Sequence, residues 1–334
     1  MTDADGRGDT QSTIDDLREL PVLGYAQRIG GPRGRLVLGI GFWNTFGGTA
    51  TFPKGDPNRP AIDESTAVVL ELVPGLAYEV NDFLSLGVGV RLGLGLLSIR
   101  STAKPTDADF SALGVGPGAT LGMMVRPTRN LSVGVTYRTP LSAHLRGTGT
   151  IYDFPTPGET TSIDDVGHDQ RWPAQALLGV SYRLGRWRVA GQIDWTDWST
   201  LDKLVFELRP ILTQVQETDF RDSIAVHVGA ELVVSPTLTL RAGYTRDGNA
   251  IGDRTMQRNY LGGPHHAIAG GVGVRLSPSW RVDAAFEYLF GKTRIVDDNL
   301  QEYVDAGFPA RANLDPGEYN AKLFTFETNV QYLF

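Results

Sequence analysis

The chain lacks cysteine altogether and has only five histidines. A disulfide scaffold and a thiolate metal site are therefore excluded. Long apolar runs are missing too, because no stretch approaches the roughly 18 consecutive apolar residues that a membrane-spanning helix requires. An excess of basic residues is also missing, and the net charge of −7 argues against broad nucleic-acid binding. None of these absences excludes a protein that spans a membrane with β-strands, whose polar faces dilute the average hydropathy.

The N-terminal stretch, residues 1–19, is polar and acidic. It contains neither the basic n-region nor the apolar h-region of a secretory signal peptide. We expect this segment to precede a single domain at residues 20–334. With 40 glycines and 9% aromatic residues, that domain has a composition compatible with one large all-β unit.

Apolar and polar residues alternate with a period of two through most of the chain, as they do in β-strands. In the stretch SWRVDAAFEYLF, Trp280, Val282 and Phe286 share one face, whereas Arg281 and Asp283 share the other. The alternation predicts about thirteen strands. They lie near residues 20–29, 35–46, 66–80, 83–102, 110–126, 130–148, 172–184, 187–208, 222–235, 237–246, 266–277, 279–295 and 322–334.

The predicted connections fall into two classes. Tight turns such as RLGRW and VSPTL join many neighbouring strands. Long polar connections are expected at residues 47–65, 149–171, 247–264 and 296–320. Short turns that alternate with long loops are typical of a barrel whose hairpins reach opposite sides of a membrane, with the turns in the periplasm and the loops outside.

Two architectures account for the alternation. In a soluble β-sandwich the apolar faces pack inward, whereas in a transmembrane barrel they face lipid and the polar faces line the lumen. Strands of ten or more residues, aromatic residues near strand ends and an apolar C-terminal strand favour the barrel. The predicted fold is therefore an all-β, transmembrane antiparallel β-barrel.

The C-terminal strand, FTFETNVQYLF, carries Phe326, Val330, Tyr332 and Phe334 on one face. A terminal phenylalanine that follows alternating apolar residues is similar to the signal read by the bacterial outer-membrane assembly machinery. We therefore expect that machinery and outer-membrane lipid to be partners of the chain, and we interpret these four residues as a membrane insertion signal.

Several stretches resemble the FadL/TodX family of outer-membrane transporters for long-chain fatty acids and hydrocarbons. The nearest is WPAQALLGVSYRLGRWRVAGQIDWTDWSTLDKLVFEL, from Trp172 to Leu208. VPGLAYEVNDFLSLGVGV, LPVLGYAQRIGGPRGRLVLGIGFWNTFGG, LTLRAGYTRDGNAIGD and HHAIAGGVGVRLSPSWRVDAAFEY resemble further hairpins of the family. The resemblance is collinear from about residue 20 to the C-terminus.

This resemblance implies passive transport of a hydrophobic small molecule, which leaves sideways where the third strand of the barrel kinks inward. The matching strand here is RLVLGIGFWNTFGG, and Gly39, Gly41, Gly47 and Gly48 are the candidates for the lateral gate. Glycine permits bulges and close backbone approach. It is also frequent in the other strands, where it serves turning and taper. We expect a monomer without a cofactor.

Charged residues of both signs are expected to face the lumen. They are Arg91, Arg138, Arg188, Asp194, His227, Glu231, Arg241, Arg281, Asp283, Glu287 and Glu327. An arginine among them would clamp a ligand carboxylate bidentately, with Arg188 and Arg241 as candidates. The alternative is a charge-paired lining that stiffens the barrel. The adjacent His265 and His266 should point to opposite faces, so we predict no metal site.

Two other functions stay open. A general porin or structural barrel would hold a water-filled lumen for small polar solutes, and a barrel fragment would have no independent function. An enzyme is not expected, because the sequence contains neither a GxSxG nor an HExxH motif.

The chain departs from the family at its start. Members begin with a signal peptide, a lumen-filling hatch and the first of fourteen strands, so the strands seen here correspond to the second to the fourteenth. We expect either a gene start placed too late or a truncated chain, and the alternative is a diverged relative that closes with fewer strands.

Overall fold

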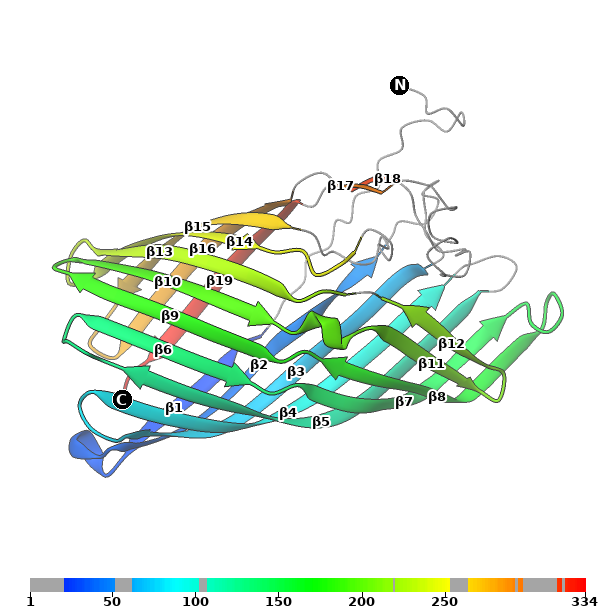
Figure 1. Cartoon of the computed structure of the whole chain (residues 1–334), viewed down its shortest axis with the longest axis horizontal. Helices are drawn as coiled ribbons and strands as arrows, with labels where there is room; N and C mark the ends of the chain where they lie inside the picture. The colour runs from blue at the N-terminus through cyan, green and yellow to red at the C-terminus, as the bar shows by residue number, and fades with distance from the viewer. Residues whose placement is uncertain are drawn as a thin grey trace, which may run out of the picture.

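The protein folds into one long antiparallel sheet that curves into the wall of a barrel (Figure 1). The computed structural model describes residues 21–51, 62–101, 107–218, 220–252, 264–291, 294–296, 317–319 and 322–334. The polar segment predicted at residues 1–19 lies outside these residues.

Thirteen of the described strands follow one another around the wall through antiparallel pairs. They are β1 (Leu23–Ile29), β2 (Leu36–Thr51), β3 (Ile62–Glu79), β4 (Leu84–Ser101), β5 (Ala108–Val125), β6 (Leu131–Arg138), β9 (Gln175–Leu184), β10 (Trp187–Thr196), β13 (Ser223–Val233), β14 (Leu238–Asp247), β15 (His265–Arg275), β16 (Trp280–Gly291) and β19 (Lys322–Tyr332). Each contains at least part of one strand predicted from the alternation.

At one end of the wall, tight turns connect neighbouring strands. We call it the short-turn end. It lies at the left of Figure 1, where the C-terminus is also found. A serine or asparagine side chain caps several of these turns: Asn81 accepts from the N–H groups of Phe83 and Leu84, and Ser235 accepts from that of Leu238. Such local side-chain bonds are the reason that Asn and Ser favour turns.

Four further strands lie at the opposite, long-loop end. They are β7 (Leu141–Tyr152), β8 (Thr160–Trp172), β11 (Lys203–Arg209) and β12 (Leu212–Glu217). They pair in the order β5, β7, β8, β11, β12 and extend beyond the wall at the right of Figure 1. Two short strands, β17 (Arg294–Val296) and β18 (Gly317–Tyr319), form a separate pair.

Helical structure is minor in the described part of the chain. It contains the single-turn 3-10 helices η1 (Gly31–Arg33) and η2 (Trp198–Thr200). None of the described helices is long and apolar enough to cross a membrane.

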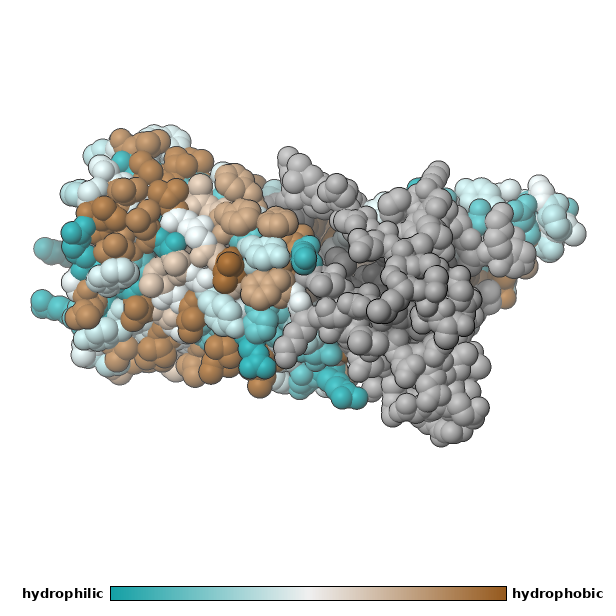
Figure 2. Space-filling view, turned by 90° about the horizontal axis from the view of Figure 1, so that it is seen from above, coloured by the Kyte–Doolittle hydropathy of each residue, from teal (hydrophilic) through white to brown (hydrophobic). Residues whose placement is uncertain are grey.

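The apolar side of the wall faces outward. On β4, the residues Leu86, Val88, Val90, Leu92 and Leu94 are each between 37% and 52% exposed. On β19, Phe326, Val330 and Tyr332 are 71%, 62% and 53% exposed. Figure 2 shows one face of the molecule, where apolar side chains cover much of the described wall. This exposure is opposite to that of a soluble sandwich, whose apolar faces are sealed between two sheets.

The buried apolar residues lie instead at the long-loop end, between β7, β8 and β11 on one side and β3, β4 and β5 on the other. We call this set the apolar core. It consists of Val69, Leu97, Ala112, Leu141, Ala143, Leu145, Ile151, Ile163, Val166, Trp172, Phe206 and Leu208.

The two end strands of the wall meet at the short-turn end. The rings of Tyr25 on β1 and Phe334, just after β19, stack with centroids 5.7 Å apart and planes 12° from parallel. The last residue of the chain therefore contacts the first described strand.

The structure differs from the sequence prediction at several places. Strands β2 and β3 occupy both ends of the loop expected at residues 47–65, and β12 was not predicted. The loop expected at residues 149–171 is wrong for most of its length, because β8 occupies Thr160–Trp172. The single strands expected at residues 130–148 and 187–208 are each divided, the first into β6 and β7 and the second into β10 and β11. In β8 a register shift opposite Gly147–Gly149 breaks the alternation, which hides the strand in the sequence.

Candidate functional site

Strand β2 carries a bulge in the middle of its length. Its register with β3 shifts between Asn44 and Phe46, which leaves Thr45 as the extra residue. A bulge bends its strand and re-aims the neighbouring side chains. Among the described residues, β1 pairs with Leu36–Phe42 of β2, and the bulge follows this paired part, where β2 is paired with β3.

The four glycines proposed for the gate have different surroundings. Gly47 has a φ of +94°, and an added Cβ would lie 1.8 Å from the carbonyl oxygen of Ala67. Gly48, by contrast, has nothing within 4 Å of an added Cβ. An added Cβ at Gly41 would meet the ring of Trp43 at 2.0 Å, whereas one at Gly39 would make an ordinary contact of 3.4 Å. Only Gly47 therefore has a backbone conformation that requires glycine.

A cluster of ionised side chains lies on the lumenal side, next to the bulge. Arg91 on β4 donates two hydrogen bonds to the carboxylate of Glu71 on β3, with N–O distances of 2.7 and 2.6 Å. Arg138 on β6 donates to the same carboxylate and to the hydroxyl of Thr45, each at 3.0 Å. Arg91 also donates to the backbone carbonyl of Thr139. We call these five residues the Glu71 cluster.

The Glu71 cluster is buried. The side chain of Glu71 is 0% exposed and that of Arg91 is 1% exposed, while Arg138 retains 17%. A buried ionic group persists only when it is paired and hydrogen-bonded. Two arginines face one carboxylate, so the cluster carries one net positive charge, and it connects β2, β3, β4 and β6 across the lumen.

The apolar core lies beside this cluster at the long-loop end. Glycines on the lumenal faces of β4 and β5 let the β7–β8 layer approach closely. An added Cβ at Gly93 would meet Leu141 at 2.5 Å, and one at Gly95 would meet Trp172 at 2.3 Å. Phe46, directly after the bulge, packs against the apolar core and makes an edge contact with Trp198 at a centroid distance of 5.5 Å. The bulge thus lies between an ionic cluster and an apolar surface.

The predicted carboxylate clamps lie on a different part of the wall. Arg241 on β14 is held between Glu231 at 3.0 Å and Asp283 at 2.7 Å. Arg188 on β10 has one distant ion pair, with Glu231 at 3.7 Å. Arg241 therefore fits the alternative of a charge-paired lining. Arg188 has N–H donors that are not used in a short ion pair. Both belong to the short-turn end and not to the Glu71 cluster.

The two adjacent histidines lie on one strand, β15. His265 and His266 point to opposite faces of β15, as predicted: His266 bonds the hydroxyl of Tyr244 on the outward face, and His265 faces Asp247. Among the described residues, no group of three or more His, Asp or Glu side chains has a metal-binding arrangement.

Residues 8–334 match the family of outer membrane protein transport proteins that is described as OMPP1/FadL/TodX. The chain belongs to this family. It is accordingly a bacterial outer-membrane β-barrel of a transport family, and the outward apolar belt is the surface that faces lipid.

Solved structures of FadL/TodX proteins share the fold. A FadL homologue from Pseudomonas aeruginosa superposes with a TM-score of 0.74 at 18% identity, over 93% of this chain and 76% of that one. The toluene transporter TodX from P. putida gives a TM-score of 0.70 at 17% identity, over 94% and 82% of the two chains. The toluene transporter TbuX from Ralstonia pickettii gives 0.69 at 15% identity, over 94% and 81%. The search of curated proteins returned no match.

The sequence prediction missed three members of the Glu71 cluster, Glu71, Thr45 and Thr139. The signal for Glu71 was present, because it is the one charged residue in the apolar stretch VVLELVPGL. A lone carboxylate at a strand position that is otherwise apolar suggests a buried ion pair. Thr45 gave no comparable signal, because a bulge depends on the pairing register and not on local sequence.

Proposed function

We propose that the protein carries hydrophobic small molecules, hydrocarbons or long-chain fatty acids, across the outer membrane and releases them sideways beside the bulge of β2. The observation that carries this proposal is the bulge itself, which follows the part of β2 paired with the described part of β1 and lies next to an apolar surface. Membership of the FadL/TodX family supports the substrate class, and solved relatives are described as toluene transporters.

The apolar core supports capture at the long-loop end. Partly buried aromatic side chains, Phe46, Phe110 and Phe154, pack against it. A hydrocarbon gains free energy when it leaves water for such a surface, at roughly 25 cal/mol per Å² of apolar area. The same argument favours an exit into the lipid, because a water-filled passage would reverse that gain.

The Glu71 cluster supports an exit at the bulge and not elsewhere on β2. Arg138 binds Thr45 and thereby fixes the extra residue against β3 and β6. We propose that Thr45 and Gly47 form the gate, and that Gly39 and Gly41 lie beside it on the part of β2 that pairs with β1.

Replacement of Gly47 by alanine tests the gate. The left-handed backbone and the clash with Ala67 should cost about 1–3 kcal/mol and force β2 into another path. Uptake of radiolabelled toluene and oleate by cells that lack their own uptake barrel should fall about tenfold, the change that ~1.4 kcal/mol makes in an equilibrium.

Gly48→Ala is the matched control, because an added methyl group there meets nothing within 4 Å. It should leave uptake unchanged. The amount of folded protein is measured for each variant by its heat-modifiable migration in gels. Normal uptake by a correctly folded Gly47→Ala variant would contradict the gate, and loss of uptake in both variants would contradict its location.

The alternative function, a general porin, predicts a different electrical conductance. A water-filled lumen would give large, steady, ion-selective currents in planar bilayers. The proposed transporter should give small currents that toluene does not alter, because its ligand leaves through the wall. Large currents together with absent uptake would favour the porin.

A further inference from the structure

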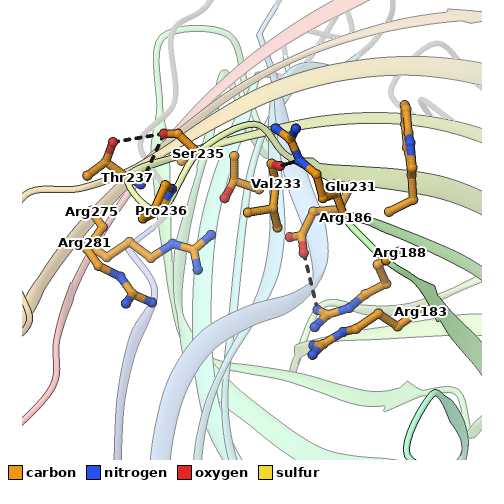
Figure 3. A pocket seen from close by; sticks show the side chains of 14 residues that line it. Arg183, Arg186, Arg188, Glu231, Val233, Ser235, Pro236, Thr237, Arg275 and Arg281 are labelled. Atoms are coloured by element: carbon orange, nitrogen blue, oxygen red, sulfur yellow. Dashed lines mark hydrogen bonds and ion pairs between the residues drawn. The ribbon is translucent and has the colours of Figure 1, made fainter.

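A cavity of about 320 Å³ opens at the short-turn end of the lumen (Figure 3). It is formed by the β9–β10 and β13–β14 turns together with the ends of β15 and β16. Its charged lining consists of Arg183, Arg186, Arg188, Glu231, Arg275 and Arg281. Five arginines therefore share this cavity with one carboxylate, in a chain whose net charge is −7.

The two nearby carboxylates do not neutralise these arginines. Glu231 bonds Arg241 at 3.0 Å and reaches Arg188 only at 3.7 Å. Asp283 bonds Arg241 at 2.7 Å and Arg281 at 3.0 Å. Each of the two carboxylates is thus shared between two arginines, and Arg241 is a partner of both carboxylates. The arginine charge of the cavity remains in excess.

Arg186 does not relieve this excess. It donates hydrogen bonds to the backbone carbonyl oxygens of Val233 and Val234, which orient the guanidinium but do not cancel its charge. For Arg183 and Arg275, the described part of the chain offers no acidic group within ion-pair distance. Figure 3 shows Arg183 and Arg188 side by side, with the long ion pair between Glu231 and Arg188.

Such an arrangement favours an anion. Like charges gathered in a cleft raise the positive potential there and concentrate counter-ions. Guanidinium groups bind carboxylate and phosphate in bidentate geometry. The hydroxyl groups of Ser235, Thr237 and Thr239 line the same cavity and provide neutral hydrogen-bond donors. The cavity lies at the lower end of the size range of small-molecule sites.

We propose that this cavity is a binding site for small anions that carry carboxylate or phosphate groups. It lies at the end of the lumen that the short turns place in the periplasm. The proposal concerns a polar site on the opposite side from the apolar core, and it does not depend on lateral release of a hydrophobic ligand.

Calorimetric titration of the full chain in a neutral detergent tests the site. The probes are citrate and inorganic phosphate, added separately at constant ionic strength. Saturable binding at one site per chain is expected. Tighter binding of citrate would identify a carboxylate ligand, and tighter binding of phosphate would identify a phosphate ligand.

The test variant is R183Q/R275Q, which removes two charges from the cavity. Its affinity should fall at least about tenfold, that is, by ~1.4 kcal/mol or more. The matched control is R126Q/R129Q, which removes the same charge from the β5–β6 turn outside the cavity and should bind as the unmodified chain does. Equal losses in the two variants would overturn the site in favour of a diffuse field.

A second variant is expected to gain affinity. Glu231→Gln frees Arg188 and adds one positive charge to the cavity, so citrate should bind several times more tightly. This measurement does not require R183Q/R275Q to fold. Weaker or unchanged binding in Glu231→Gln, or no saturable binding to the unmodified chain, would overturn the proposal.

Discussion

At the scale of single residues, Glu71 is the side chain that holds the Glu71 cluster together. Its carboxylate accepts three hydrogen bonds, from two arginines on different strands. It is fully buried, and so is Arg91. Without the carboxylate, the buried guanidinium group of Arg91 would lose its ion pair in a place where water cannot hydrate it.

Glu71→Gln should therefore lower the free energy of unfolding by about 3–5 kcal/mol, the range for removing one partner of a buried pair. The measurement is equilibrium unfolding in urea from lipid vesicles. The control is Glu79→Gln, which breaks an ion pair with Arg28 whose two side chains are each 37% exposed and should change little. Equal effects of the two substitutions would contradict the role of the Glu71 cluster.

Asp222 gives the protein a pH dependence at the long-loop end. In the connection between β12 and β13, the side chain and the backbone N–H of Ser199 and the indole N–H of Trp195 hold the pKa of Asp222 below its ordinary value. A carboxyl with a lowered pKa in the folded state stabilises the fold above its unfolded pKa, about 3.9. That contribution is lost as the pH falls through the folded value.

Asp222→Asn should remove this part of the pH dependence. Thermal unfolding of the two proteins between neutral pH and about pH 2 measures it. Near neutral pH the unmodified chain should be the more stable one, and the difference should shrink only below about pH 4. A difference that stays constant down to the lowest pH would contradict the assignment.

At the scale of elements, the glycines of β4 determine how the long-loop end is built. Gly87, Gly93 and Gly95 lie at alternating positions on one face of the strand. In the structure Gly93 and Gly95 receive Leu141 and Trp172 from the β7–β8 layer. The face of β4 that carries these glycines is therefore a packing surface, because only positions without a Cβ atom let another layer come this close.

Gly95→Val should displace Trp172 from the apolar core and weaken binding of hydrophobic ligands. Overpacking of this kind costs typically 1–3 kcal/mol. The control is Gly87→Val on the same face of β4, where an added Cβ would make an ordinary contact of 3.6 Å. Fluorescence quenching by a brominated fatty acid measures the binding, and an equal affinity in the two variants would contradict this packing role.

The regularity of each strand explains which strands could be predicted from the sequence. Long segments with unbroken alternation, such as β4 and β16, were located well. Strand β8 was missed because its buried residues, Ile163 and Val166, are three positions apart across a bulge. Strands β10 and β11 were merged because η2, which separates them, is only three residues long and gives no helical period of its own.

At the scale of the whole molecule, the exposed apolar belt and the C-terminal strand make a prediction about assembly. Phe334 is 75% exposed and stacks on Tyr25. We propose that the C-terminal strand is a membrane insertion signal. Phe334→Ala should then slow insertion into vesicles that contain the outer-membrane assembly machinery, because it removes the terminal aromatic residue of that strand. Leu333→Ala is the control. The measurement is the folded fraction over time, and identical rates in the two variants would contradict the signal.

The sequence by itself determined the period of the strands, the side of each strand that is apolar and the kinship with FadL/TodX proteins. These follow from local patterns, since alternate residues of a strand point to opposite faces wherever the strand lies. It also placed the candidate gate glycines on β2, the strand that carries the bulge. It did not select Gly47 from the four glycines, because a positive φ arises from the pairing with β3.

Only the tertiary structure decided which side chains meet. Glu71, Arg91 and Arg138 are separated by 20 to 67 positions in the chain, and the arginines of the short-turn cavity come from four different strands and a turn. Their encounter depends on strand order and register, which a one-residue shift would change completely. The ionic cluster at the bulge and the basic cavity are for that reason properties of the folded barrel and not of any segment of its sequence.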